Sequence, residues 1–373
     1  MRILIALKMA IHDRSTTTGA LIGVIVIVFL VGQQLSVFFG LLNLTSVLPD
    51  HSNAEVWVMS KNIRNADSGN LVSGSYIDRI IGIKGVEWVE PVLIGSGVFK
   101  RDDGSFEPVR LIGLRRPSLH GGPWNFYQRG EQVLLDLESV VIDRLDLSKL
   151  GHPLLDEVRE IGGKRVKVAG IAEGARGFQG TLVFATLEKV KEISKTPAGR
   201  YSAILVKLSN EADKNKIIGN MKEILPNCSV FSSQELSNLT RKYYITNTGI
   251  GGSFFFSTSI AILTGVVIVT LTMYTSVLSR ARDFAVIRAI GGRKRDIMII
   301  VISEVFFITA IGIFIGFMLL STLFNYTVKS EIPSYFPAYI APLLAFVTIF
   351  VSFLGSLAAI RVALKADPAQ VFH

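Results

Sequence analysis

The sequence predicts an integral membrane α-helical protein with four transmembrane helices and a large α/β extracytoplasmic domain inserted between helices 1 and 2. Hydrophobic residues make up 49% of the 373 residues and charged residues only 18%, and the mean hydropathy is +0.45. The apolar residues are concentrated in four long runs, and the chain between the first two runs is long and polar. About 20 consecutive apolar residues suffice to cross a bilayer. This patterning therefore indicates a multi-pass protein with one sizeable polar domain.

The amino-terminal part combines a surface helix with a membrane span. Residues 1–18 carry Arg2, Lys8 and Arg14 among apolar residues at helical spacing, which predicts a cytoplasmic amphipathic helix at the membrane surface. Residues 19–42 contain no charged residue and are predicted to be transmembrane helix 1. A cleavable signal peptide is the alternative. We disfavour it because the apolar run is too long and no small-residue cleavage site stands out.

Residues 43–248 are the large polar segment, which must lie outside if helix 1 begins inside. We predict an extracytoplasmic α/β domain of two lobes that follow each other along the chain. The first lobe is expected to contain strands at 55–60, 86–92, 94–100 and 109–114 and a helix at 76–83. The second is expected to contain strands at 139–142, 165–171, 181–184 and 203–208 and helices at 187–193 and 212–225. Gly162-Gly163 predicts a hairpin turn directly before the strand that begins at 165.

Three further apolar runs complete the membrane part. They predict helix 2 at 249–278, helix 3 at 298–325 and helix 4 at 338–360, with an outer loop at 326–337 and a cytoplasmic tail at 361–373. A helical pattern that begins near Ser233 runs on towards helix 2, and Gly249 can bend the chain there. Both termini are then expected to be cytoplasmic.

Residues 279–297 form a strongly basic loop between helices 2 and 3, which marks the cytoplasmic side. Its apolar residues recur at helical spacing and predict a short amphipathic helix, with Gly291-Gly292 as the stop. The apolar residues are Phe284, Val286, Ile287 and Ile290. Two interpretations stay open from charge and spacing alone. The helix receives a push from a cytoplasmic partner, or it is a topology anchor that contacts nothing.

No motif in the sequence predicts chemistry in this chain. Gly162-Gly163-Lys164 lacks the first glycine of a phosphate-binding loop, and no nucleophile elbow occurs. The 5 histidines lack the spacing of metal ligands. We therefore expect no catalytic, cofactor-binding or metal site and no enzyme activity of the chain alone. The net charge of +9 comes mostly from the inner loops, so it does not predict nucleic-acid binding.

Glu304 is a charged residue deep inside the third predicted span. A carboxylate there is costly, so we expect either a hydrogen-bonded structural role near the inner boundary or a functional one. Gly312 and Gly316 follow as a G-x-x-x-G pair, which lets two helices approach closely. We predict that these three residues serve intramembrane packing and dimer geometry.

The order of one span, a large outer domain and three spans resembles the FtsX-like, or MacB-type, permeases of ABC transporters. The stretch SRARDFAVIRAIGGRKRDI at 279–297 is similar to the cytoplasmic motif of that family, and SEVFFITAIGIFIG at 303–316 is similar to its third span. The outer stretches at 86–116 and 164–171 also look like the family's outer domain. The tail ADPAQVF at 366–372 is similar to the DevC-type subgroup.

The resemblance implies a permease subunit without its own ATPase site. It implies a dimer, expected to be a homodimer, with two copies of a separate cytoplasmic ABC ATPase that carry ATP and Mg. The short helix in the basic loop would be the coupling helix, with helix 2 as a lever for mechanotransmission to the outer domain. The implied ATPase-coupling residues are Arg280, Arg282, Asp283, Phe284, Ala285, Val286, Ile287, Arg288, Ala289, Ile290 and Gly291.

The same resemblance implies a location in a prokaryotic cytoplasmic (inner) membrane, in contact with membrane lipid. The expected function is export or extraction of a lipophilic substrate such as a lipid, lipoprotein, drug or haem. The alternative is a signal transmitter that activates an outer partner such as a cell-wall hydrolase. An anchored adhesion protein without an ATPase is a third hypothesis. A periplasmic adaptor, a heterodimer, the substrate, the direction of movement and the envelope type stay open.

Overall fold

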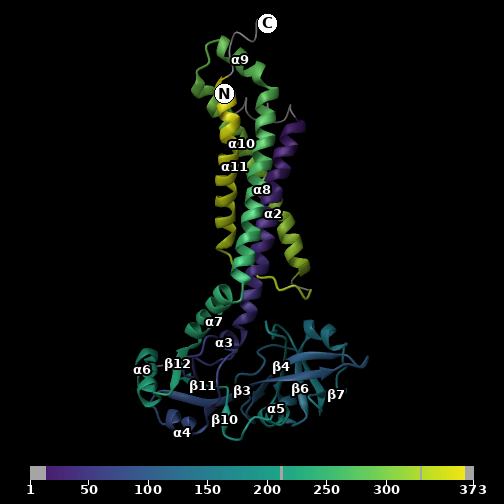
Figure 1. The fold of residues 1–373 in the computed structure, drawn as a ribbon, viewed down its shortest axis with the longest axis vertical. Coiled ribbons are helices and arrows are strands. Elements are labelled where there is room, and N and C mark those ends of the chain that lie inside the picture. The colour runs from purple at the N-terminus through teal and green to yellow at the C-terminus, as the bar shows by residue number, and fades with distance from the viewer. Residues whose placement is uncertain (1–13, 211–212, 328–329, 366–373) are drawn as a thin grey trace. The chain divides into compact units, whose positions relative to one another are not determined.

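The computed structural model describes residues 14–210, 213–327 and 330–365, and Figure 1 labels its elements. The chain divides into two compact units. The membrane unit comprises residues 1–40 and 251–373, and the α/β unit comprises residues 41–250. Residues 1–13 of the predicted surface helix and residues 366–373 of the predicted tail lie outside the described residues.

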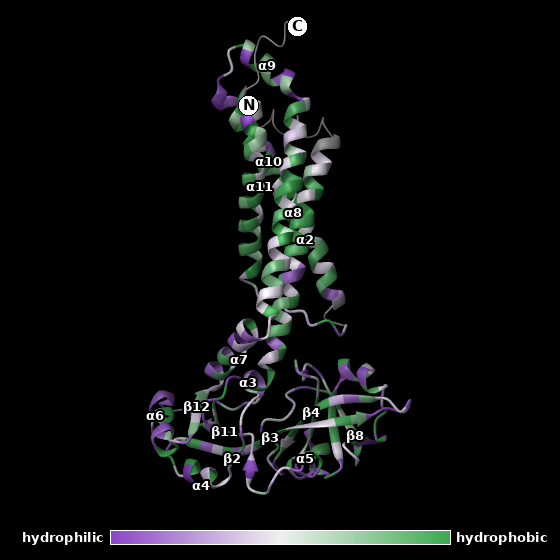
Figure 2. Cartoon of the chain, in the orientation of Figure 1, coloured by the Kyte–Doolittle hydropathy of each residue, from purple (hydrophilic) through white to green (hydrophobic). Residues whose placement is uncertain are grey.

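Four long helices lie in the membrane unit among the residues that the structure describes. They are α2 (Arg14–Thr45), α8 (Ile250–Ser279), α10 (Lys294–Thr327) and α11 (Ile340–Lys365). Each contains a stretch long and apolar enough to cross a membrane, and Figure 2 shows that hydrophobic residues dominate all four. The prediction of four spans is confirmed. Their limits differ, because residues 14–18, which we assigned to the surface helix, continue α2 instead.

The membrane unit has a single continuous core. Buried residues from all four helices form it, including Val24, Ile27 and Val28 of α2, Val269 of α8, Val301 of α10 and Val351 of α11. The first described residues of α2, the last of α11 and the chain between α8 and α10 lie at the same end of this helical bundle (Figure 1). An even number of spans brings the start of the first span and the end of the last to one side.

The α/β unit is built on a ten-stranded sheet. The strand order is β12-β1-β11-β3-β4-β9-β6-β8-β5, and β7 pairs with β3 and β8. The strands are β1 (Val56–Ser60), β3 (Val86–Lys100), β4 (Phe106–Leu114), β5 (Phe126–Gln128), β6 (Ser139–Asp143), β7 (Val158–Ile161), β8 (Lys164–Ala172), β9 (Thr181–Thr186), β11 (Ala203–Leu208) and β12 (Cys228–Ser232). A separate pair joins β2 (Val72–Ser73) to β10 (Arg200–Tyr201).

Five helices belong to the α/β unit. They are α3 (Val47–His51), α4 (Ser75–Ile81), α5 (Leu187–Ser194), α6 (Lys214–Ile224) and α7 (Ser233–Asn247). The α4 and α6 helices cover the part of the sheet that contains β1, β11 and β12 and enclose a core around Val58, Ile204 and Met221. The α5 helix packs on β3, β4 and β9. The short α3 packs on α7.

The sheet corrects the predicted strands at 86–92 and 94–100, because β3 is one continuous strand. It pairs with β11 over its first half, up to Val92, and with β4 from Leu93 onward. A change of partner along one strand leaves no break in the local sequence. The break predicted between 92 and 94 therefore has no counterpart in the structure, where only the partner of β3 changes.

The strands also do not form the two predicted lobes that follow each other along the chain. The beginning and the end of the unit pair with each other, since β1 lies between β11 and β12. The strands from β4 to β9 are inserted between these two pieces of chain. Gly162-Gly163 does form the predicted hairpin turn, with both φ angles positive, and joins β7 to β8.

Candidate functional site

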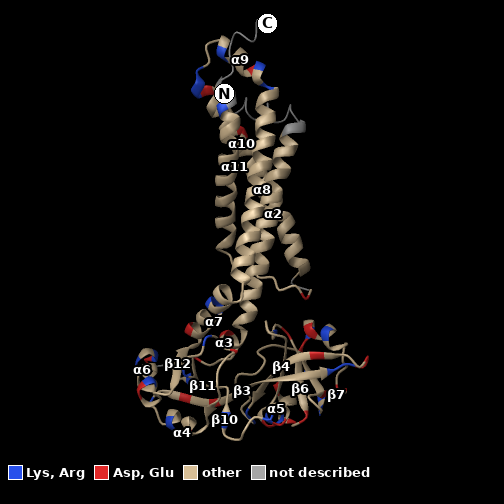
Figure 3. Cartoon of the chain, viewed as in Figure 1, with Lys and Arg blue, Asp and Glu red and all other residues tan. Residues whose placement is uncertain are grey.

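The short helix α9 (Ala281–Ala289) lies between α8 and α10, where the sequence predicts an amphipathic helix. Lys and Arg residues are frequent in and directly after this helix (Figure 3), and Arg293, Lys294 and Arg295, which follow it, are exposed. The structure therefore places a short helix and a basic surface together at one end of the bundle.

Two glycines end α9. Gly291 has a φ of +94°, its N–H donates to the carbonyl of Arg288 at 3.1 Å, and the N–H of Gly292 donates to the carbonyl of Ile287 at 2.9 Å. These two bonds are the Schellman pattern, which needs a left-handed residue that glycine adopts without a steric penalty. The predicted helix stop is thus present as a defined cap.

The α9 helix has a buried face and an exposed face. Phe284 and Ala285 are fully buried, and Ile287 packs against the membrane core. The exposed face carries apolar and charged residues, with Val286 at 45% and Ile290 at 82% exposure. Its members are Arg282, Asp283, Val286, Ala289 and Ile290. The four apolar residues that predicted the helix are therefore divided between two faces.

Arg280, which the sequence groups with the coupling residues, is buried and forms an ion pair with Glu304. Its Nη2 donates to Glu304 Oε1 at 2.6 Å and also to the hydroxyl of Ser276. The side chains of Arg280 and Glu304 are only 8% and 2% exposed. The pair joins the end of α8 to α10 immediately before α9 begins, so it holds the base of that helix.

Gly312 and Gly316 pack against α2 of the same chain. A Cβ at Gly312 would lie 2.6 Å from Val24 Cγ1, and one at Gly316 would lie 2.7 Å from Val28 Cβ. Both distances are shorter than any real contact, so the close approach of α10 and α2 requires glycine at these positions. The expected role of these residues in a dimer stays a prediction.

We expect Gly312→Leu to destabilise the membrane unit by about 1–3 kcal/mol, because the added side chain would force α10 and α2 apart. The measurement is SDS-induced unfolding of the purified chain, followed by helical circular dichroism. Gly252→Leu is the matched control, since nothing lies within 4 Å of the Cβ position at Gly252. Equal effects of the two variants would contradict this account.

At the other end of α8 the chain passes into α7, which begins with a capping box. The Ser232 hydroxyl accepts from the N–H of Glu235 at 3.2 Å, and Glu235 Oε2 accepts from the N–H of Ser232 at 2.8 Å. The helix begins at Ser233, where the sequence pattern placed it. The capping box itself was not predicted, although Ser232 and Glu235 have the S-x-x-E spacing that signals it. The predicted continuous helix from Ser233 is interrupted after Asn247, and Gly249 between α7 and α8 has a φ of +79°.

Asp50 of α3 binds two side chains of α7. The Ser237 hydroxyl donates to Asp50 Oδ1 at 2.5 Å, and Arg241 Nη2 donates to Asp50 Oδ2 at 2.6 Å. The Ser46 hydroxyl donates to the same carboxylate at 2.7 Å. Because α3 follows α2 and α7 precedes α8 along the chain, Asp50 ties together the two segments that lead to the membrane helices. The sequence offers no spacing signal for contacts between such distant residues.

Tyr244 anchors α7 to two loops of the α/β unit. Its hydroxyl donates to Asp67 Oδ2 at 3.0 Å and accepts from Gln179 Nε2 at 2.6 Å. Burial, and then the Asp67 carboxylate, raise the pKa of Tyr244 well above its usual value. Burial also raises the pKa of Asp67, against the opposing effects of Arg110 and of the Tyr244 hydroxyl. Tyr244 is thus a buried anchor of α7.

We expect Asp67→Asn to remove the contribution of Asp67 to the pH dependence of the α/β unit, which is a loss of stability as pH rises. A carboxyl group whose pKa is raised by folding stabilises the fold below its unfolded pKa of about 4, and this contribution is lost as pH rises through the folded pKa. Thermal unfolding of the full chain at several pH values, followed by tryptophan fluorescence, measures this, because all three tryptophans, Trp57, Trp88 and Trp124, lie in the α/β unit.

Asp156→Asn is the control, and its effect on the pH dependence of stability should have the opposite sign, since Arg129 lowers the pKa of Asp156. Its stabilising contribution is present above the unfolded pKa and is lost as pH falls. The Asp156→Asn variant should therefore lose stability at neutral pH and match the native chain in acid. If both variants changed the pH dependence in the same direction, the assignment for Asp67 would be wrong.

Comparison with known proteins identifies the carboxy-terminal part of the chain. Residues 255–368 match the family described as FtsX-like permease C-terminal. Two relatives, both described as uncharacterized ABC transporter permeases, come from Mycobacterium tuberculosis strains CDC 1551 and H37Rv. Each is 27% identical over 236 residues, which cover 60% of this chain and 60% of the relative.

Two solved structures are similar to part of the chain. One is the periplasmic region of MacB from Actinobacillus actinomycetemcomitans, with 14% identity and a TM-score of 0.38 over 52% of this chain and 93% of that one. The other is the extracellular domain of the noncanonic ABC-type transporter YknZ from Gram-positive bacteria. It has 15% identity and a TM-score of 0.35 over 48% of this chain and 98% of that one.

Proposed function

We propose that this multi-pass membrane protein, whose residues 255–368 are an FtsX-like permease domain and which is homologous to ABC transporter permeases, works as a permease subunit driven by a separate ATPase. The observation that carries the proposal is the geometry of α9. This helix presents Val286 and Ile290 on an exposed face, and the Arg280–Glu304 pair fixes its base. An exposed apolar helix face held on a rigid support is a suitable surface for a partner protein.

In this proposal α9 binds in a cleft of the ATPase at the cytoplasmic side, where the basic residues around it are expected to lie. Closure of the two ATPase copies moves α9, and the Arg280–Glu304 pair passes the movement to α8 and α10 together. The movement then passes along the chain from α8 to α7, and Asp50 and Tyr244 attach α7 to the rest of the α/β unit. The α/β unit would lie outside the cytoplasmic (inner) membrane.

The proposed work of this movement is export or extraction of a lipophilic substrate by a homodimer of the chain, in contact with membrane lipid. ATP and Mg would be bound by the partner ATPase. The alternative is a signal transmitter whose α/β unit activates an outer protein partner, such as a cell-wall hydrolase, with no export. The attachment of α7 through Asp50 and Tyr244 serves either function, because both require the α/β unit to follow the membrane helices.

The test is purification of the tagged, detergent-solubilised chain from its native membrane, followed by an ATPase assay of the eluate. We expect an ATPase to co-purify, and we expect Ala289→Arg to remove it. Ala289 is a better position than Arg288, which also belongs to the predicted set, because Ala289 is on the exposed face and Arg288 is half-buried.

The eluate also distinguishes the two functions. A bound lipophile supports a transporter, and a stoichiometric outer protein supports a signal transmitter. The absence of any ATPase, under conditions in which other membrane complexes stay intact, would contradict the proposal and favour an anchored domain.

A further inference from the structure

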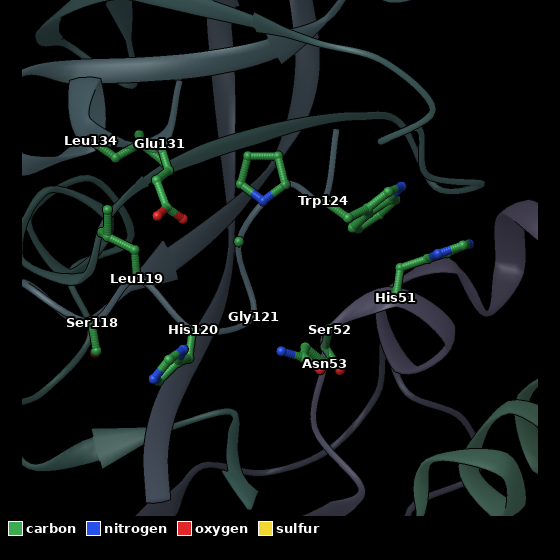
Figure 4. Close-up of a pocket in the computed structure, with 12 residues that line it drawn as sticks. His51, Ser52, Asn53, Ser118, Leu119, His120, Gly121, Trp124, Glu131 and Leu134 are labelled. Atoms are coloured by element: carbon green, nitrogen blue, oxygen red, sulfur yellow. The ribbon is translucent and has the colours of Figure 1, made fainter. Parts of the chain in front are cut away.

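The α/β unit contains a cavity of about 330 Å³ whose lining comes from two separate parts of the chain. One part is the end of α3 and the residues that follow it, and the other is the loop after β4 with η1 (Glu131–Leu135) (Figure 4). The polar residues of the lining are His51, Ser52, Asn53, Ser118, His120 and Glu131. Cavities that bind small ligands begin at about this size.

Stacked aromatic pairs support two sides of this cavity. The His51 imidazole stacks on the Trp124 indole with 4.6 Å between ring centroids, and His120 stacks on Trp88 at 4.3 Å. Each stack holds an imidazole in a defined orientation, since a flat ring on an indole has little freedom to rotate. The lining is therefore organised before any ligand arrives.

One further observation points to a ligand. Leu119, another lining residue, has a φ of +51°, which is unfavourable for a bulky side chain. Such strained positions concentrate at binding sites.

The chemistry of the lining narrows the class of ligand. Glu131 is the only carboxylate of the lining, and the lining contains no Lys or Arg. An anion would meet this carboxylate without a counter-charge. His51, His120 and Glu131 do not form a metal site, since no group of three such side chains within the described ranges is placed to hold a metal ion.

We propose that this cavity binds a small, neutral, hydroxyl-rich molecule such as a sugar ring. Hydroxyl groups both donate and accept, so they match the Glu131 carboxylate and the Asn53 amide together. An ammonium ion could use Glu131 but would offer no acceptor to the Asn53 amide donor. Figure 4 shows the Glu131 carboxylate and the Asn53 amide directed towards the space between the two walls.

The cavity is next to the segment that ties α3 to α7. His51, Ser52 and Asn53 directly follow Asp50, which binds Ser237 and Arg241. A ligand that orders these residues would also restrict Asp50. This inference does not depend on an ATPase partner, because binding can be measured on the chain alone.

The experiment is a fluorescence titration of the full chain in a detergent without a sugar headgroup. Two of the three tryptophans stack on lining histidines, so occupancy is expected to change their emission. The probes are glucose, galactose, mannose and N-acetylglucosamine at millimolar concentrations, with inorganic phosphate as the anion and tetramethylammonium as the cation. We expect a saturable response to at least one of the sugars and none to the two ions.

Glu131→Gln and Asn53→Gly should each weaken that binding by about tenfold, as expected for the loss of one hydrogen-bonding group. Glycine is chosen at position 53 because it readily adopts the φ of +57° there. Glu138→Gln is the control, because Glu138 is exposed on the same segment and does not line the cavity. The native chain and all three variants should have the same far-ultraviolet circular dichroism. A response to phosphate or tetramethylammonium instead of the sugars, no response to any probe, or sugar binding that is unchanged in both cavity variants would overturn the proposal.

Discussion

Ile290→Arg is expected to weaken the association of the chain with the proposed partner ATPase strongly while leaving the helix bundle folded. Ile290 is 82% exposed in the structure, so the new side chain meets no obstacle within the chain itself. In the complex the same residue would be buried in an apolar contact, where a buried charge without a partner is costly. We expect a loss of about 2 kcal/mol or more, which is about 30-fold in affinity. Co-purification and ATPase activity of the eluate measure it.

Ile224→Arg is the matched control. Ile224 is also an exposed isoleucine, at 41%, but it belongs to the α/β unit. It should leave ATPase association unchanged, and both variants should have native circular dichroism. If Ile290→Arg retained the ATPase, the exposed face of α9 would not be the binding surface. The alternative that the basic loop is only a topology anchor would then be favoured.

Glu304→Met is expected to destabilise the membrane unit by about 3–5 kcal/mol, because it leaves the buried Arg280 guanidinium without its counter-charge. Both side chains are nearly inaccessible, and an uncompensated charge in a membrane helix bundle is especially unfavourable. SDS-induced unfolding of the purified chain, followed by circular dichroism, measures the loss. We also expect weaker ATPase association, because α9 would lose the support at its base.

The double variant Arg280→Met with Glu304→Met is the informative control. Replacing a buried ion pair by two apolar residues of similar size is often neutral for stability. The double variant should therefore recover most of the stability that Glu304→Met loses, and the coupling energy should be about 2 kcal/mol. Additive effects of the two single changes would show that the pair does not act as a unit.

The double variant also separates stability from function. If it is stable and still associates with the ATPase, the pair serves only to hold the bundle together. If the double variant is stable but its rate of ATP hydrolysis no longer differs between the native membrane and detergent, the charges themselves transmit the movement of α9. The first result would confine the proposed mechanism to the exposed face of α9.

Several features were determined by the sequence alone, because they depend on residues that are close along the chain. The four spans follow from the length of the apolar runs, and α2, α8, α10 and α11 confirm them. The end of α9 follows from Gly291-Gly292, since only glycine readily adopts the positive φ of this cap. The similarity to FtsX-like permeases rests on the same kind of local pattern and is confirmed over residues 255–368.

Other features were decided only by the tertiary structure, because they depend on residues that folding brings together. Arg280 was grouped with the exposed coupling residues, but it is 24 positions from its partner Glu304 and buried with it. The pairing of β3 with β11 and the contacts of Asp50 with α7 join segments more than 100 residues apart. The sheet order depends on such distant pairings. Local spacing identifies an element and its end, whereas the partner of each face is selected by packing over the whole chain.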